Sequence, residues 1–113
     1  LVMESKATVR HVRITPRKIR LVTTLVRGKP INEALTILRF NSRRRVAKTI
    51  STLLESAVAN AEQKGRIDVD NLFIKTLVVD QGPTLKRYRA RAKGSGTRIL
   101  KKTSHITVVL EER

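Results

Sequence analysis

The residue types that most often carry out catalysis are sparse in this sequence and widely separated. His11 and His105 have no carboxylate beside them in the sequence to orient a general base. Asp68 and Asp70 form a close acidic pair, which fits a solvated turn better than a catalytic dyad. The Gly94-Ser95-Gly96 segment lacks the Lys-Ser or Lys-Thr that completes a phosphate-binding loop. There is no cysteine, so thiolate zinc sites are excluded, and the sequence predicts no enzyme, no metal site and no cofactor.

Positive charge is the chemistry that the sequence supplies in quantity. Lys and Arg number 25 against 9 Asp and Glu, which gives a net charge of +16 over 113 residues. Because so much like charge repels itself in a compact chain, it favours a polyanionic partner: RNA, DNA or an anionic membrane. No apolar run approaches the roughly 18 residues of a membrane span, and no signal peptide is visible, which disfavours the membrane. The lack of cysteine fits a reducing compartment such as the cytosol.

The first basic block runs from residue 6 to residue 29 and contains no acidic residue. Its members are Lys6, Arg10, Arg13, Arg17, Lys18, Arg20, Arg27 and Lys29. Arg17 and Lys18 fall in the first turn of an expected helix, where the helix dipole disfavours cations. An anion at this helix start would reverse the penalty, because the free backbone N–H groups there bind phosphate. The alternative interpretation is a merely solvated helix start.

The second basic block lies between residues 81 and 105, which also lack acidic residues. Its members are Lys86, Arg87, Arg89, Arg91, Lys93, Arg98, Lys101 and Lys102. The segment is too polar to join the core, and glycines near its middle predict a turn, so residues 82–104 are expected to form a long β-hairpin. A reversal near Gly94 would place Val78 opposite Val109 and Arg89 opposite Arg98, a like-charge pairing that needs a counter-anion. The alternative is a charged, solvated strand edge.

The first half of the chain predicts one strand followed by two helices. Residues 6–14 nearly alternate, with a phase slip at Arg10-His11 that a β-bulge would allow. Thr15-Pro16 is typical of a helix start, and Gly28 of its end. A short helix with Asn32 as its cap then follows.

The second half predicts one long helix and two apolar strands. The helix opens at Ser42 and carries a single apolar stripe, composed of Val46, Ala47, Ile50, Leu53, Leu54, Ala57, Val58 and Ala61. Leu72 to Val79 is apolar on both faces, which predicts a central strand, and Ile106 to Leu110 is its expected neighbour. The order indicates a single α+β domain over residues 1–113, with three helices packed on a small antiparallel sheet and a long protruding basic β-hairpin.

The aromatic residues are Phe40, Phe73 and Tyr88 alone, too few for a platform on which successive bases stack. Recognition is therefore expected to use phosphates, 2′-hydroxyls and RNA shape, without flipped bases. A structural RNA-binding protein fits best. The alternatives are a DNA-binding protein with a basic helix in the major groove and an enzyme acting on nucleic acid. The basic residues fall on a strand, on a helix start and on the expected hairpin of residues 82–104. They do not form one recognition face, which weighs against the DNA alternative.

Six segments in order resemble the family of the bacterial large-subunit ribosomal protein numbered twenty-two. They are TPRKIRLV at 15–22, RGK at 27–29, LESAVANA at 54–61, DQGP followed by KR within 80–87, RAKG at 91–94 and KTSHITV at 102–108. The resemblance covers about residues 6–110. The chain departs from the family's pattern at the tip, with Ala90 in place of a usual proline and Ser95-Gly96 in place of a common Arg-Ala.

The resemblance implies a structural protein of the large ribosomal subunit that binds its rRNA early in assembly and contacts neighbouring ribosomal proteins. It implies a cytoplasmic ribosome, with an organellar one left open, and a hairpin that lines the exit tunnel beside the nascent polypeptide. The expected RNA-binding residues are the whole first block together with Lys86, Arg87, Arg89, Arg98, Lys101, Lys102, Thr103, Ser104 and His105. The expected tunnel-lining tip is Arg89, Ala90, Arg91, Ala92, Lys93 and Gly94.

Overall fold

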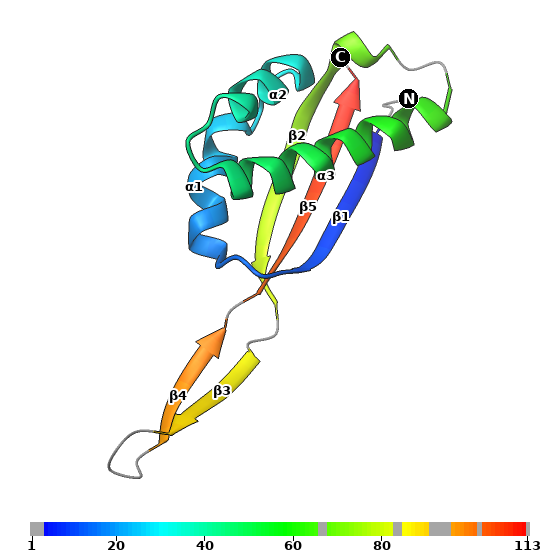
Figure 1. The fold of residues 1–113 in the computed structure, drawn as a ribbon. Helices are drawn as coiled ribbons and strands as arrows, with labels where there is room; N and C mark the ends of the chain where they lie inside the picture. The colour runs from blue at the N-terminus through cyan, green and yellow to red at the C-terminus, as the bar shows by residue number, and fades with distance from the viewer. Residues whose placement is uncertain (1–3, 66–67, 83–84, 91–95, 102, 113) are drawn as a thin grey trace.

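Three helices lie on one face of a three-stranded antiparallel sheet, as the computed structural model shows (Figure 1). The structure describes residues 4–65, 68–82, 85–90, 96–101 and 103–112, with the backbone alone over 85–90 and 96–101. The elements of the main body are β1 (Glu4–Val12), α1 (Pro16–Val26), α2 (Ile31–Arg39), α3 (Arg44–Gln63), a 3-10 turn (Val69–Asn71), β2 (Leu72–Gln81) and β5 (Ser104–Glu112). A separate two-stranded sheet pairs β3 (Leu85–Ala90) with β4 (Gly96–Lys101). The predicted α+β class is confirmed.

The core lies between α3 and the sheet. The apolar stripe of α3 is buried as the spacing predicts, with Ile50 and Leu54 fully inaccessible and Val58 partly buried. In β5, alternate residues from Ser104 to Leu110 are buried, so one face of this strand packs under the helices. Small residues at Ala57 and Ala61, both fully buried, allow α3 to approach the sheet closely. No helix in the described part of the chain is long and apolar enough to cross a membrane.

The sheet order β1-β5-β2 makes β5 the central strand, so the predicted central position of Leu72 to Val79 is wrong. The apolar pattern that misled this prediction comes from a β-bulge at Lys75, a residue with no pairing partner between Ile74 and Thr76. The extra residue shifts the phase, so that Leu72 and Ile74 before it and Leu77 and Val79 after it are all buried. The apolar residues that suggested two buried faces therefore lie largely on one face, while Val78 is 40% exposed.

Two of the three predicted helix starts are wrong by one or two residues. α1 begins at Pro16 as expected, although Thr15 makes no side-chain capping hydrogen bond. α2 begins at Ile31 with Pro30 before it, and the Asn32 side chain instead donates to Asp70 Oδ1 at 3.3 Å. α3 begins at Arg44, because Asn41 Oδ1 accepts from the Arg43 N–H at 2.8 Å and forms a local turn ahead of the helix.

The free edge of β2 is covered by the end of α1 and the segment that follows it. Gly28 N donates to Ile74 O at 3.1 Å, and Ile74 N donates to Lys29 O at 3.0 Å, a local pairing that uses the positive φ of Gly28. Further along the edge, Arg27 Nη2 donates to Leu77 O at 2.7 Å and Arg20 Nη2 to Val79 O at 2.8 Å. These contacts occupy backbone acceptors that would otherwise invite another strand.

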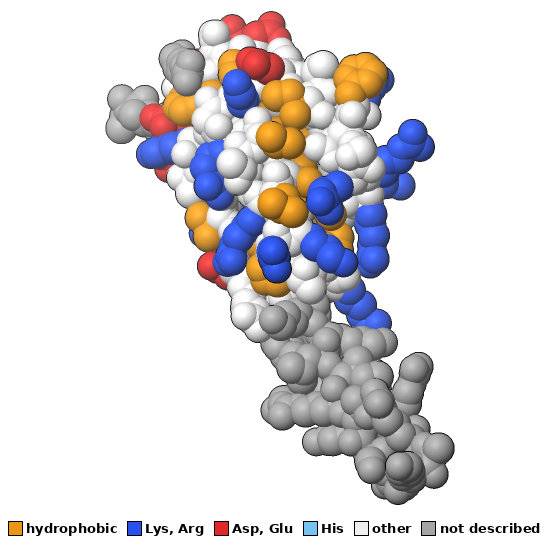
Figure 2. Space-filling model, turned by 90° about the vertical axis from the view of Figure 1, so that its left-hand side faces the viewer, with side chains coloured by type: hydrophobic (Ala, Val, Ile, Leu, Met, Phe, Trp, Pro, Cys, Tyr) orange, Lys and Arg blue, Asp and Glu red, His pale blue; other side chains and the backbone are white. Residues whose placement is uncertain are grey.

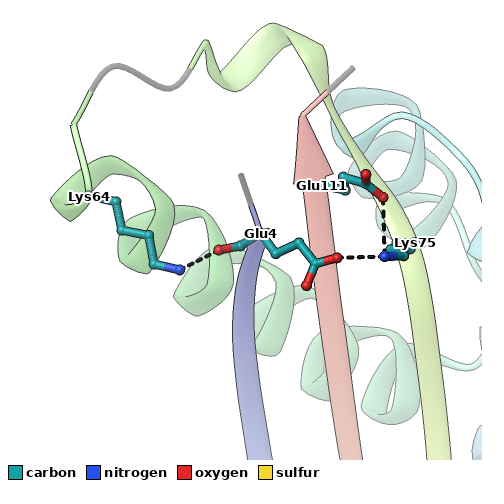
Figure 3. Close-up of polar contacts among 4 residues, drawn as sticks. All are labelled: Glu4, Lys64, Lys75 and Glu111. Carbon is teal, nitrogen blue, oxygen red and sulfur yellow. Dashed lines mark hydrogen bonds and ion pairs between the residues drawn. The ribbon is translucent and has the colours of Figure 1, made fainter. Parts of the chain in front are cut away.

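α3 covers the free edge of β1 in the same way. The Asn60 side chain donates to Lys6 O at 3.2 Å, and the Lys64 ammonium donates to Glu4 O (Figure 3). The Ser5 hydroxyl, 2% exposed, donates to Ala57 O at 2.6 Å. β1 also carries the phase slip that its sequence predicts, since its pairing with β5 shifts between Val9 and Val12.

The pairing registers differ from those that the sequence analysis expects. Val78 lies opposite Thr107 instead of Val109, and Arg89 opposite Thr97 instead of Arg98. In the β3–β4 pair each basic residue is opposite an uncharged one, as Arg87 is opposite Ile99. The offset of one residue thus removes the like-charge pairs that the expected register would create. The predicted turn at 94–96 falls largely outside the described residues.

The end of the sheet where β2 begins is held by an ion network around Lys75 (Figure 3). Glu4 and Glu111 are direct cross-strand partners on β1 and β5, a placement in which like charges repel. The Lys75 ammonium lies between them, 2.5 Å from Glu4 Oε1 and 3.6 Å from Glu111 Oε2. The bulge in β2 therefore also places the cation that two neighbouring carboxylates require.

The ion network around Lys75 should stabilise the fold up to alkaline pH, and its contribution to the free energy of unfolding should be lost at higher pH. The hydrogen bond to Glu4, followed by the Glu111 charge, raises the pKa of Lys75 above its usual 10.5. A raised pKa means that the contribution is fully present below about pH 10.5 and is lost as pH rises through the folded-state value. Lys75→Met should therefore lower Tm at about pH 8, with the difference from wild type shrinking above about pH 10.5. Parallel melts of Lys18→Met serve as the control, and a pH-independent Tm difference for Lys75→Met would contradict the network.

Candidate nucleic-acid interface

The start of α1 presents cations where its helix dipole is positive. Arg17 and Lys18 are exposed in the first turn, which contains no acidic residue and receives no side-chain cap. Pro16 has no N–H and the Lys18 N–H donates to Thr15 O at 3.1 Å, so the Arg17 N–H is the donor of this turn that remains for an anion, while the two cations raise the local potential. Both side chains are exposed at the helix start, and the role of this start as an anion-binding site stays a prediction.

The start of α3 repeats this arrangement close by and was missed by the sequence analysis. Arg43, Arg44 and Arg45 are all exposed, with no acidic residue in the first turn and no side-chain cap. The two helix starts are linked, because Arg45 Nη2 donates to Arg13 O at 3.4 Å. The signal was available in the sequence as three consecutive arginines just before an apolar stripe, the same dipole conflict seen at Arg17 and Lys18.

The remaining cations of the first block have different surroundings. Lys6 and Arg10 are exposed on β1, and Arg13 is exposed in the loop before α1. Lys29 forms an ion pair with Glu33 at 3.7 Å. Arg20 and Arg27 are exposed over part of their length, but one amino group of each is bound to the edge of β2 as described above. The candidate anion surface is therefore defined as the helix-start cluster, composed of Arg10, Arg13, Arg17, Lys18, Arg43, Arg44 and Arg45.

Figure 2 views the side of the molecule formed by α1 and α2. Lys and Arg side chains lie on both sides of a line of hydrophobic ones, and Asp and Glu gather mostly towards the end where β2 begins. Leu21 and Leu25, 52% and 48% exposed, belong to the exposed hydrophobic residues of α1. This separation of charge directs the positive field away from the acidic end of the sheet.

The arm is the segment 82–104 that contains β3 and β4. Its root is a tightly packed junction formed by Gly82 and the start of β5. Gly82 N donates to Thr103 O at 2.8 Å, and Thr103 is only 4% exposed. The Ser104 hydroxyl is fully buried and donates to Ile14 O at 2.5 Å. His105 Nδ1 accepts from His11 N at 3.1 Å, and the two rings meet edge to face with centroids 4.9 Å apart. Thr103, Ser104 and His105 thus join the arm to β1, and their RNA-binding role stays a prediction.

Replacing Gly82 should disturb this junction. A Cβ at position 82 would lie 2.6 Å from Thr103 Oγ1, closer than side-chain contacts allow, and 3.0 Å from His105 Cε1, tighter than most such contacts. Because Thr103 is buried and β-branched, Gly82→Ala should destabilise the protein by about 1–3 kcal/mol, measurable by urea denaturation. The double variant with Thr103→Ala should recover part of the loss through coupling of the two sites. Unchanged stability of Gly82→Ala would mean that the root is more loosely packed than described.

The predicted contacts of the arm can be placed only in part. Positions 86, 87 and 89 lie on β3, and positions 98 and 101 on β4. The predicted tip residues Arg91, Ala92, Lys93 and Gly94, together with Lys102, lie outside the described residues. Among the residues that are described, no group of acidic or histidine side chains could hold a metal ion.

Comparisons with known proteins identify the family. The family model described as Ribosomal protein L22p/L17e matches residues 7–111. The large ribosomal subunit protein uL22 of Syntrophotalea carbinolica is 60% identical over 111 residues, covering 98% of this chain and 100% of the relative. That of Geobacter metallireducens is 57% identical with the same coverage, and that of Desulfatibacillum aliphaticivorans is 54% identical over 110 residues, 97% of this chain and 100% of the relative. These matches cover nearly the whole chain, and the chain belongs to the ribosomal protein L22p/L17e family.

Proposed function

We propose that the chain is a structural constituent of the large ribosomal subunit that binds large-subunit rRNA. The observation that supports this most directly is the meeting of two uncapped, cation-bearing helix starts, which the Arg45–Arg13 contact links. Two such starts repel each other in the isolated protein, and a phosphate backbone placed between them removes the repulsion. The protein family is one of ribosomal structural proteins, and the proposal includes no catalysis.

The arm, residues 82–104, provides the second part of the proposed interface. Over 85–90 and 96–101 its basic positions face uncharged partners in the β3–β4 register, so this described part of the arm carries its charge without direct like-charge pairs. We infer that phosphates close to the root hold Lys86, Arg87, Lys101 and Lys102, and that the tip extends to the exit tunnel and the nascent polypeptide. Neighbouring ribosomal proteins complete the set of partners, and the ribosome is the site of action.

Neutralising the helix-start cluster tests this function. The triple variant Arg17→Gln, Lys18→Gln and Arg43→Gln removes three proposed phosphate contacts from surface positions. It should bind a large-subunit rRNA fragment more weakly and lower the log–log salt slope by about 2–3. Filter binding gives the affinity, and sucrose gradients of cells expressing the variant give its incorporation into large subunits.

The matched control removes the same charge from the acidic end. Lys29→Gln, Lys64→Gln and Lys75→Gln replace three lysines that contact Glu33 or Glu4. Lys29 belongs to the expected RNA contacts of the first block, but its ion pair with Glu33 leaves it out of the helix-start cluster. This variant should keep the salt slope and the incorporation of the wild type. Equal losses in both variants would show that net charge alone governs binding. Equal affinity for duplex DNA and for the rRNA fragment would favour the DNA-binding alternative.

A further inference from the structure

A groove between α2 and α3 adjoins the proposed interface and shares Arg44 with it. It has a volume of about 610 Å³, within the roughly 300–1,000 Å³ range of small-molecule sites. Leu35, Leu38 and Ala47 supply its apolar lining, and Thr36, Asn41 and Ser51 supply neutral polar groups. An apolar lining with a few polar groups suits a flat organic ring better than it suits bulk water.

Three cations line the same groove. Arg39 ends α2, and Arg44 and Lys48 lie one turn apart on the first turns of α3. Within the described part of the chain their charged groups make no hydrogen bond or ion pair, in contrast to Lys29, Lys64 and Lys75. The acidic lining residue is Glu55, about three turns along α3 from the helix start. One side of the groove is therefore strongly positive, which complements a phosphodiester.

Phe40 supplies an aromatic ring directly after Arg39 in the chain, at the α2 end of the groove lining. Its side chain is 80% exposed, although phenylalanine is among the residues most often buried. It follows Arg39 and precedes Asn41, both of which line the groove. The small number of rings in the sequence predicts recognition without flipped bases. What the sequence did not reveal is that one of them is largely exposed between two residues, Arg39 and Asn41, that line a groove.

From this combination we propose that the α2–α3 groove binds one unpaired RNA nucleotide. The base stacks on the Phe40 ring or enters over the Leu35 and Leu38 lining, and Arg39, Arg44 and Lys48 hold the flanking phosphates. The inference rests on the proposed RNA-binding function and adds a nucleotide-specific contact to it. An acidic peptide would satisfy the cations but would gain little from an exposed ring, so RNA is the favoured occupant.

The absence of tryptophan from the chain makes a direct test possible. Phe40→Trp introduces a single tryptophan whose fluorescence is quenched when a base stacks on it. The probes are a short RNA hairpin with an unpaired loop, a blunt RNA duplex of equal charge, and a poly-glutamate peptide. The hairpin should quench Trp fluorescence at position 40, and the duplex and peptide should not. Val78→Trp, on the open face of the sheet, is the matched control and should respond to none of the probes.

Two further variants separate stacking from charge. Phe40→Leu keeps the apolar surface and should weaken binding of the hairpin about tenfold while leaving the duplex unaffected. Arg44→Gln with Lys48→Gln should abolish the quenching in the Phe40→Trp background. If hairpin and duplex quench equally, or if poly-glutamate quenches most strongly, the nucleotide site is refuted. Salt-dependent binding of the rRNA fragment by the unsubstituted chain would then still support the proposed function, which fails only if that binding is absent.

Discussion

Raising the salt concentration from about 50 to about 200 mM should weaken binding of the chain to a large-subunit rRNA fragment by roughly a thousandfold or more. The reason is the release of counterions from each phosphate that a cation neutralises. The helix-start cluster alone supplies seven exposed cations, Arg10, Arg13, Arg17, Lys18, Arg43, Arg44 and Arg45, and the arm adds further basic positions. Six or more simultaneous contacts produce a loss of this size. Filter binding across a salt series, plotted as log affinity against log salt, measures it.

The slope of that plot is the decisive quantity. Each contact with duplex RNA contributes roughly 0.7–0.9 to it, so a slope steeper than about −5 is expected. The control variant with Lys29, Lys64 and Lys75 neutralised should give a parallel line. A slope equivalent to one or two ion pairs would contradict the phosphate-contact interface, even if the affinity at low salt were high.

The substitution Leu54→Ala should have the second large effect, on the free energy of unfolding. Leu54 is fully buried at the centre of the α3 stripe, so removing its side chain leaves a cavity between helix and sheet. Such changes cost roughly 2–5 kcal/mol, a large share of the roughly 5–15 kcal/mol that stabilises a domain. At about 4 °C per kcal/mol, Tm should fall by roughly 8–20 °C. Thermal melts followed by circular dichroism measure the change.

The same substitution at an exposed leucine is the control. Leu21 is 52% exposed on α1, and Leu21→Ala should change stability by no more than about 0.5 kcal/mol. Saturating rRNA fragment should restore part of the Leu54→Ala loss, because a ligand that binds only the folded state stabilises it by mass action. Similar losses at Leu54 and Leu21 would mean that α3 does not form the centre of the core.

Regular spacing explains why much of the fold could be predicted. The α3 stripe, the Pro16 start of α1 and the alternation of β5 are local patterns, and each is found where its spacing predicts. The β1 irregularity was visible as well, and the structure places a positive φ at His11 there. The ordered matches to one family supported the same α+β arrangement.

The candidate site could be predicted less fully, because net charge does not state which cations are engaged within the protein. Arg20 and Arg27 were grouped with Arg17 and Lys18 as equivalent RNA contacts. The structure binds one amino group of each to the edge of β2 instead, while Arg17 and Lys18 remain exposed. Which basic residues bind the protein's own backbone and which remain free for a partner is therefore clear only once the neighbouring strand is known.

The sequence by itself determined the helices, the apolar strand residues, the excess of positive charge and the family, since all depend on residue type and short-range spacing. Tertiary structure alone decided that β2 lies at the edge of the sheet. It also decided that the apolar residues of β2 share one face, because one bulged residue at Lys75 reverses the face on which every later side chain lies. It also decided that the starts of α1 and α3 meet and that Phe40 stays exposed. These features depend on how segments that are distant in the chain pack together, and no local sequence pattern encodes such contacts.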